Sequence, residues 1–240
     1  MNLDVLAFAA HRDDLEITCG GTLARLAEQG HAVGACDLTE GEMGTRGSAA
    51  DRLAEAEEAA RILGLKARVN CGLPDAGLFN VREQQLKVVE ILRRFRPSVV
   101  LLPALEQRHP DHATAPRIVF DACYFAGLAK FPDLKHDAGR AHRPRKIFWV
   151  HNSYAAAPPT FVVDVTAQME KKVASILAYR TQFPDKSDPG KPVPRAEMEE
   201  WVRSRATAYG LMIGKKSGEG FIQREAVEIE DVTKLLGKSI

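Results

Sequence analysis

The most constraining feature of this 240-residue sequence is a regular alternation between two hydrophobic periods. Short apolar runs rich in Val, Leu and Phe are separated by stretches in which apolar residues recur at helical spacing. The strand-like runs cover residues 5–10, 32–39, 67–71, 99–103 and 147–151, and the helical patterns between the first four cover residues 21–29, 49–63 and 83–95. Strands that alternate with helices in this way are typical of a parallel sheet.

The rest of the chain continues the same pattern less regularly. A helix is expected over residues 113–128, an irregular polar stretch over 130–145, a strand over 161–165 and a helix over 167–180. Residues 184–194 hold four prolines, which exclude a long helix or strand and predict a loop or arm. The expected fold is therefore α/β: a Rossmann-like, mostly parallel sheet with helices on both faces and an active site at the carboxyl ends of the strands. Length and a 45% hydrophobic content favour one domain over residues 1–240.

Charge and cysteine usage narrow the class of function. Lys and Arg number 33 against 32 Asp and Glu, which gives no support for nucleic-acid binding and favours a small-molecule ligand. The four cysteines are dispersed without a C-x-x-C pair, so neither a disulfide framework nor a zinc knuckle is indicated. The N-terminus lacks a basic leader and no apolar run is long enough to span a bilayer, so we expect a cytoplasmic enzyme without membrane association.

Two histidine-containing segments follow two of the expected strands. One is His11-Arg12-Asp13-Asp14, and the other is His109-Pro110-Asp111-His112. A hydrolytic zinc site needs three nitrogen or oxygen ligands, a position open to water and a nearby carboxylate. His11, Asp14 and His112 can supply the ligands, and Asp13 then remains as the general base. Each segment taken alone could instead be a turn with a helix-capping Asp, but two segments at matching topological positions favour a metal site.

His109 and Asp111 belong to the second segment and are expected to act from outside the ligand set. A fourth protein ligand would close the site to water, so His109 is expected to stabilise the oxyanion that forms when a carbonyl is attacked. Asp111 could orient the His109 imidazole, and a helix cap is an equal alternative.

Two further segments reach the same edge of the sheet. The turn Cys19-Gly20-Gly21-Thr22 lacks the G-x-G-x-x-G spacing of a dinucleotide site and indicates close helix packing. The glycine-containing loop over residues 40–47 opens onto the expected site. Arg52, just beyond it, could present its guanidinium to a carboxylate or to sugar hydroxyls, although a solvated surface arginine is as good an interpretation.

At this point the sequence resembles a known family. Residues 10–16, Ala-His-Arg-Asp-Asp-Leu-Glu, resemble the Ala-His-Pro-Asp-Asp-x-Glu signature of the LmbE or PIG-L family of zinc-dependent N-acetylglucosamine deacetylases, and residues 109–112 resemble its second signature. Residues 37–39, 41–47, 52, 73–75 and 218–221 resemble one bacterial branch of this family. The enzymes of that branch deacetylate N-acetyl-glucosaminyl-L-malate in the synthesis of bacillithiol.

The resemblance implies roles for individual residues. It makes His11, Asp14 and His112 the zinc ligands, Asp13 the general base and His109 the oxyanion partner. It also implies that Arg52 contacts the substrate and that the chain self-associates, as hexamers. Arg12 departs from the family's proline, and Met198 or Trp201 lies where some relatives place a tyrosine over the site.

The expected reaction is removal of the N-acetyl group from an N-acetylglucosaminide, with N-acetyl-glucosaminyl-L-malate as the first candidate substrate. Alternatives are an amide hydrolase of the same family that acts on another N-acetyl sugar, a chitobiose-like substrate or a thiol conjugate, and a sugar-binding protein without activity. The ligand set also suits Fe²⁺ or another divalent ion, and zinc is preferred because hydrolysis needs no redox change.

Overall fold

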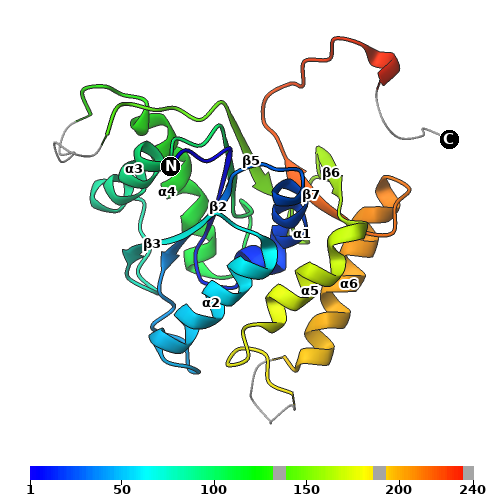
Figure 1. Ribbon diagram of the computed structural model, residues 1–240. Helices are drawn as coiled ribbons and strands as arrows, with labels where there is room; N and C mark the ends of the chain where they lie inside the picture. The colour runs from blue at the N-terminus through cyan, green and yellow to red at the C-terminus, as the bar shows by residue number, and fades with distance from the viewer. Residues whose placement is uncertain (132–138, 186–192, 235–240) are drawn as a thin grey trace.

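The structure, a computed structural model, describes residues 1–131, 139–185 and 193–234. Its strands are β1 (Val5–Ala9), β2 (Val33–Thr39), β3 (Ala67–Leu73), β4 (Val99–Leu102), β5 (Lys146–Val150), β6 (Phe161–Asp164) and β7 (Gly218–Ile222). Its α-helices are α1 (Asp14–Glu28), α2 (Ala49–Leu63), α3 (Arg82–Phe95), α4 (Pro110–Ala126), α5 (Met169–Leu177) and α6 (Arg195–Met212), with 3₁₀ turns η1 (Thr166–Gln168) and η2 (Val232–Lys234). Figure 1 shows the path of the chain through these elements.

The strands form one sheet in the order β3-β2-β1-β4-β5-β7-β6. The first five pair in parallel, and β7 pairs antiparallel with β5 and with β6. The predicted mostly parallel α/β sheet is therefore confirmed. Strand β7 was not expected, because its sequence Gly-Glu-Gly-Phe-Ile has little intrinsic strand preference.

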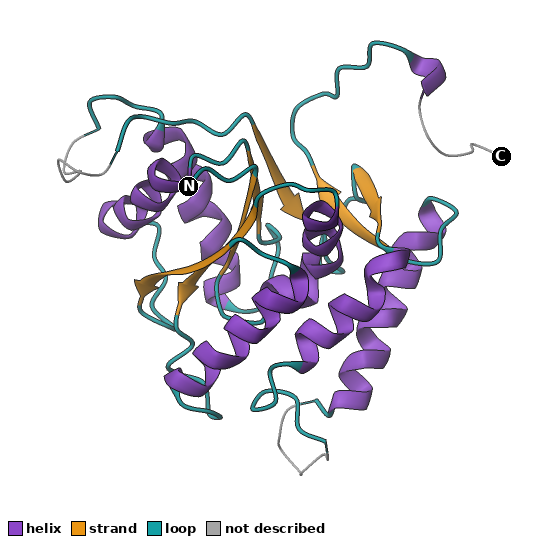
Figure 2. Ribbon diagram, in the orientation of Figure 1, coloured by secondary structure: helices purple, strands orange, loops and turns teal. Residues whose placement is uncertain are grey.

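Helices cover both faces of the sheet, as predicted (Figure 2). Side chains such as Leu6 and Phe8 of β1 point into a core shared with α3 and α4. Their neighbours Val5, Ala7 and Ala9 point to the opposite face, where they pack against α1. A third cluster joins α2, α5 and α6 outside α1. The two-residue alternation of the strands thus separates the apolar side chains into two layers.

The order of the strands positions the site. Strand β1 lies between β2 and β4, so the connections leaving β1 and β4 diverge to opposite faces and leave a crevice at their carboxyl ends. His11 follows β1 and His109 lies in the segment that joins β4 to α4.

Helix α1 differs from the sequence-based expectation. It begins at Asp14, not near Gly21, and is kinked at Cys19, which has non-helical φ and ψ. The kink is stabilised from β7, because the Glu219 carboxylate accepts hydrogen bonds from the backbone N–H groups of Gly21 (2.9 Å) and Thr22 (2.7 Å). A cap from a residue almost two hundred positions away leaves no local sequence signal.

Helix α6 was also not predicted, and it follows the proline-rich segment. Residues 186–192 of the loop predicted over 184–194 lie outside the described part of the chain. Glycines let β7 and α6 pack closely: a Cβ on Gly220 would lie 2.7 Å from the Tyr209 ring. In the described part of the chain no helix combines the length and the apolar character needed to cross a bilayer.

Candidate active site

The turn between β1 and α1 is held in an unusual backbone conformation. Asp13 is the N-cap residue of α1 and has φ 114° and ψ −26°, a region that few residues other than glycine occupy. Within the same turn, the backbone N–H of His11 donates to Oδ2 of Asp14 at 2.9 Å. Such strain concentrates at functional sites, where the surrounding structure compensates its cost. Here it places the side chains of His11, Asp13 and Asp14 just beyond the end of β1.

The second segment forms the start of α4. His109 is the N-cap residue, and its Nδ1 accepts the backbone N–H of Asp111 at 3.2 Å. Pro110 occupies the first turn, where a missing N–H costs nothing. His112 follows in the same turn, and its ring reaches the β1–α1 turn.

Three predicted ligands meet at this point. Nδ1 of His11 lies 3.0 Å from Nε2 of His112, and that Nε2 lies 3.3 Å from Oδ1 of Asp14. Nδ1 of His11 is 3.7 Å from Oδ2 of Asp14. Ligands about 2.1 Å from a tetrahedral ion lie about 3.4 Å from each other, and these pairwise spacings are close to that value, although the two Asp14 distances belong to its two different oxygens. Their role as ligands stays a prediction.

The electrostatics of the cluster agree with a site for a cation. Burial alone would raise the pKa of Asp14, but His112 and His11 hold that pKa at about 2. Burial alone would lower the pKa of His112, yet the facing Asp14 carboxylate raises it. A carboxylate that remains ionised beside two imidazoles is an arrangement that a divalent ion can use directly.

Two carboxylates orient His11 from outside this cluster. Its Nε2 lies 2.9 Å from Oδ1 of Asp75 and 3.3 Å from Oδ2 of Asp111. Donation from Nε2 to Asp75 leaves the Nδ1 lone pair directed at Asp14 and His112, which is the tautomer that a ligand needs. Asp111 also accepts the backbone N–H groups of Ala76 (2.8 Å) and Leu78 (3.3 Å).

The position of Asp111 corrects one expectation. Sequence reasoning offered two equal roles for Asp111, orientation of the His109 ring or a helix cap, whereas the structure places its carboxylate against His11. Asp75 received no role from its sequence pattern, although it follows β3 at the same edge of the sheet. Its second oxygen accepts the backbone N–H of Met43 (2.9 Å) and so attaches the loop over residues 40–47 to the site. Among the described residues, the three-residue groups whose ligand atoms all lie within 4.8 Å of one another are His11 with His109 and His112, and His11 with Asp75 and Asp111, so Asp14 belongs to neither group.

Asp13 lies beside the cluster with its side chain 17% exposed. Burial and the nearby charges of Asp14 and Glu16 raise its pKa well above the usual range, and the Arg52 guanidinium, 3.7 Å away, opposes that shift. A raised carboxyl pKa suits a group that must accept a proton and release it again.

His109 faces the same space. Its ring centroid lies 5.1 Å from that of His11 and 5.0 Å from that of His112. Burial and the two neighbouring imidazoles lower its pKa, which favours the neutral ring. Because Nδ1 accepts a hydrogen bond, the proton of the neutral ring lies on Nε2, where it is available to an oxyanion.

Arg12 and Arg52 are buried, and both donate hydrogen bonds to backbone carbonyl oxygens near the site. Arg52 is 5% exposed and donates to the carbonyl oxygens of Gly41 (3.1 Å) and Arg12 (2.9 Å). The structure thus places the Arg52 guanidinium behind Asp13, and contact with substrate stays a prediction. Arg12, 4% exposed, donates to the carbonyl oxygen of Ala49 at the start of α2 (3.0 Å). Its cation is therefore directed at the α2 backbone.

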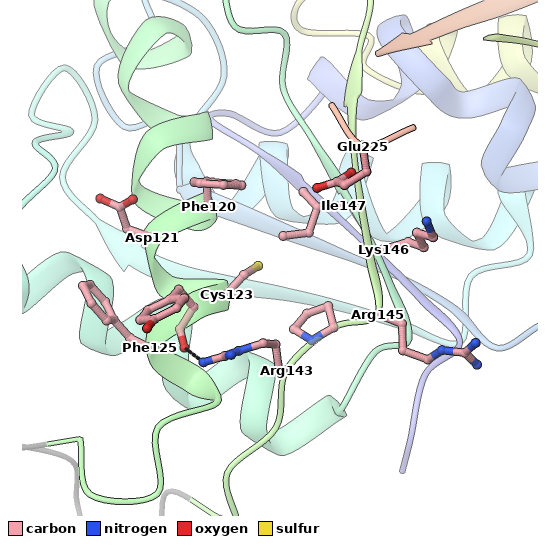
Figure 3. Close-up of a pocket in the computed structure, with 11 residues that line it drawn as sticks. Phe120, Asp121, Cys123, Phe125, Arg143, Arg145, Lys146, Ile147 and Glu225 are labelled. Atoms are coloured by element: carbon pink, nitrogen blue, oxygen red, sulfur yellow. Dashed lines mark hydrogen bonds between the residues drawn. The ribbon is translucent and has the colours of Figure 1, made fainter. Parts of the chain in front are cut away.

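A cavity of about 310 Å³ opens beside the cluster and includes Asp14 and His112 in its lining. A larger cavity, of about 390 Å³, lies between α4 and the segment that leads into β5. Figure 3 shows Phe120, Cys123 and Phe125 of α4 on one side of it and Arg143 on the other. Its described lining includes none of the predicted site residues, so the smaller cavity is the candidate for substrate.

Comparison with known proteins identifies relatives along most of the chain. The family model for PIG-L, GlcNAc-PI de-N-acetylase, matches residues 6–123, a range that contains both histidine segments. Diacetylchitobiose deacetylase from Thermococcus kodakarensis is 32% identical over 226 residues, which cover 90% of this chain and 81% of that protein.

Solved structures show the same fold. The conserved protein TT1542 from Thermus thermophilus aligns with a TM-score of 0.86 and 38% identity, over 97% of this chain and 100% of the other. GalB, the 4-carboxy-2-hydroxymuconate hydratase of Pseudomonas putida, aligns with a TM-score of 0.78 over 97% and 100% of the two chains, but at 22% identity it shows the fold alone. Because a hydratase shares this fold, the fold by itself does not define the reaction.

Proposed function

Because the chain belongs to the PIG-L family of de-N-acetylases, we propose that it hydrolyses the acetamide of a small N-acetylglucosaminide at a divalent ion held by His11, Asp14 and His112. As a member of this family it is an enzyme that cleaves amides. The observation that carries the proposal is the approach of the three side chains: Nδ1 of His11 lies 3.0 Å from Nε2 of His112, and each of these nitrogens lies 3.3–3.7 Å from one of the two carboxylate oxygens of Asp14.

Each residue of the site has a separate role in the proposed reaction. A divalent ion, when bound, supplies Lewis acidity at the acetamide carbonyl. Asp13 removes a proton from the attacking water and later transfers it to the leaving amine, so the products are acetate and a free glucosamine amine. Nε2–H of His109 donates to the oxyanion. Asp75 and Asp111 fix the orientation of His11, and Arg52 supports Asp13 and the loop over residues 40–47.

For the substrate we propose N-acetyl-glucosaminyl-L-malate, the precursor deacetylated in bacillithiol biosynthesis. The support is the resemblance at residues 41–47, 73–75 and 218–221. Diacetylchitobiose is the rival substrate, because the similar Thermococcus enzyme is a diacetylchitobiose deacetylase. Zinc is the preferred ion because the reaction involves no change of oxidation state, and Fe²⁺ remains an alternative.

One experiment tests these proposals together. Purified protein is analysed for metal content and then incubated with N-acetyl-glucosaminyl-L-malate or with diacetylchitobiose, and the release of acetate and amine is measured. We expect one divalent ion for each chain and faster hydrolysis of the malate conjugate. Preference for diacetylchitobiose would contradict the substrate proposal, and tight binding without acetate release would indicate a sugar-binding protein.

A further inference from the structure

The cavity beside the metal-ligand cluster is closed on one side by helix α6. Its other walls come from the end of β1, the segment after β4, the first turns of α1 and α4, and the segment after β5. The contributing side chains of α6 are Trp201 and Arg205. They are four residues apart, so they lie one above the other on the same face of the helix. Helix α6, which the hydrophobic pattern did not predict, therefore forms part of the candidate substrate site. Of the two residues that the resemblance suggested over the site, Trp201 lines this cavity.

The Arg205 guanidinium is held in place within this wall. Its Nη2 donates to the backbone carbonyl oxygen of His151 at 2.8 Å. Its central carbon lies 5.4 Å from the centroid of the Trp201 ring and 5.9 Å from that of Tyr209. A guanidinium carries five N–H donors, and this bond uses one of them. The others can serve a ligand without the cost of first ordering the side chain.

Charged and aromatic side chains are unevenly distributed around the cavity. Among its described lining residues, Arg205 is the single lysine or arginine. The carboxylate in the lining, Asp14, belongs to the proposed metal centre. Two aromatic residues of the lining, Trp201 and Tyr154, are 47% and 55% exposed. Such rings can pack against the apolar face of a sugar, and the nearby guanidinium is suited to a carboxylate.

From this arrangement we propose that Arg205 binds a carboxylate on the aglycone of the substrate and that Trp201 packs against the sugar ring. Helix α6 then selects anionic aglycones over neutral ones, because a neutral aglycone offers the guanidinium no charged partner. This inference rests on the proposed deacetylase function and assigns the choice of aglycone to a specific residue. It also favours a carboxylate-bearing conjugate over a neutral disaccharide on structural grounds.

The test compares two substrates that differ in charge, N-acetyl-glucosaminyl-L-malate and its dimethyl ester. In Arg205→Gln we expect kcat/KM for the diacid to fall about 10- to 100-fold, mainly through KM, because a charge-assisted bond is lost. The ester should lose less than about 3-fold. Arg205→Lys should recover part of the loss, since it restores the charge without the planar geometry. An equal loss on both substrates would indicate a structural role for Arg205 and overturn the proposal.

Two further variants sharpen the result. Arg203→Gln removes a cation from the same helix that pairs with Glu170 and Glu199, and it should leave the diacid-to-ester ratio at the wild-type value. Trp201→Ala should raise KM for both substrates alike, because ring packing does not depend on charge. A change in the ratio in Arg203→Gln would contradict the assignment to Arg205.

A binding measurement separates this inference from the proposed function. Titration calorimetry with the amine product, glucosaminyl-malate, gives Kd for the wild type and for Arg205→Gln without any turnover. We expect weaker binding in the variant, again by about 10- to 100-fold. If the wild type binds this ligand through Arg205 but releases no acetate from N-acetyl-glucosaminyl-L-malate, the proposed function fails while the role of Arg205 in binding a carboxylate stands. Equal affinity in the two proteins would overturn the inference.

Discussion

At the scale of single residues, the site depends on the backbone of Asp13 as much as on its carboxylate. The φ of 114° is disfavoured for alanine, so Asp13→Ala would change both the chemistry and the turn. Asparagine tolerates positive φ better and matches aspartate in shape. Asp13→Asn is therefore the cleaner removal of the proposed base.

For Asp13→Asn we predict retained metal content and a rate about 10²- to 10⁴-fold lower, the range of a positioned base. His112→Ala serves as the comparison, because it should lose metal as well as activity. Elemental analysis and acetate release measure the two properties. Full turnover in Asp13→Asn would exclude Asp13 as the base, and unchanged metal in His112→Ala would exclude His112 as a ligand.

The contact of Asp75 with His11 leads to a second prediction at this scale. Asp75→Asn should weaken metal affinity about 10- to 100-fold, since an amide holds the ligand imidazole less strongly than a carboxylate does. Competition with a chelating dye gives the affinity. Asp121→Asn is the control and should bind metal like the wild type, because the Asp121 carboxylate accepts a hydrogen bond from the Asn80 side chain and does not contact His11. An unchanged affinity in Asp75→Asn would show that Asp111 alone orients His11.

At the scale of elements, α1 depends on a buried ion pair. Glu219 of β7 contacts Nζ of Lys172 from α5 and accepts the two N–H groups beyond the kink, and both charged side chains are 3% exposed. The pair thus joins β7 and α5 to α1, the helix that begins at Asp14. Removal of one partner leaves the other charge buried without compensation.

We predict that Glu219→Gln lowers the free energy of unfolding by about 3–5 kcal/mol, as measured by urea denaturation. Glu170→Gln is the matched control, because the Glu170 carboxylate pairs with Arg203 in solvent and its loss should leave the urea midpoint nearly unchanged. Equal midpoints for the two variants would mean that the buried pair does not stabilise the kinked helix.

At the scale of the whole molecule, the proposed metal couples segments that are far apart in the chain. His11 and His112 are separated by 101 positions, so an ion bound by both stabilises the folded state over the unfolded chain. A ligand present at about a hundred times its Kd contributes about 2.7 kcal/mol. We predict that a chelator lowers the melting temperature, that zinc restores it, and that His112→Ala responds to neither. Identical melting curves with and without chelator would contradict the prediction that a bound metal ion stabilises the folded state.

The resemblance also implies a hexamer, and this stays a prediction. Light scattering should give six times the 26.4 kDa mass of one chain. A monomeric mass would show that the described chain forms its site alone.

The sequence by itself determined the α/β architecture and the neighbourhood of the site. Two-residue and helical periodicities are local properties, and the rule that parallel strands end at one edge brings His11, Asp14 and His112 together without knowledge of any contact. Only the tertiary structure decided which groups those side chains meet. The Asp111 carboxylate orients His11. Arg12 and Arg52 donate hydrogen bonds to backbone carbonyl oxygens. Helix α6 closes one side of the cavity with Trp201 and Arg205. These partners depend on how distant segments pack, because a hydrogen bond needs atoms within about 3 Å and sequence spacing does not fix such distances.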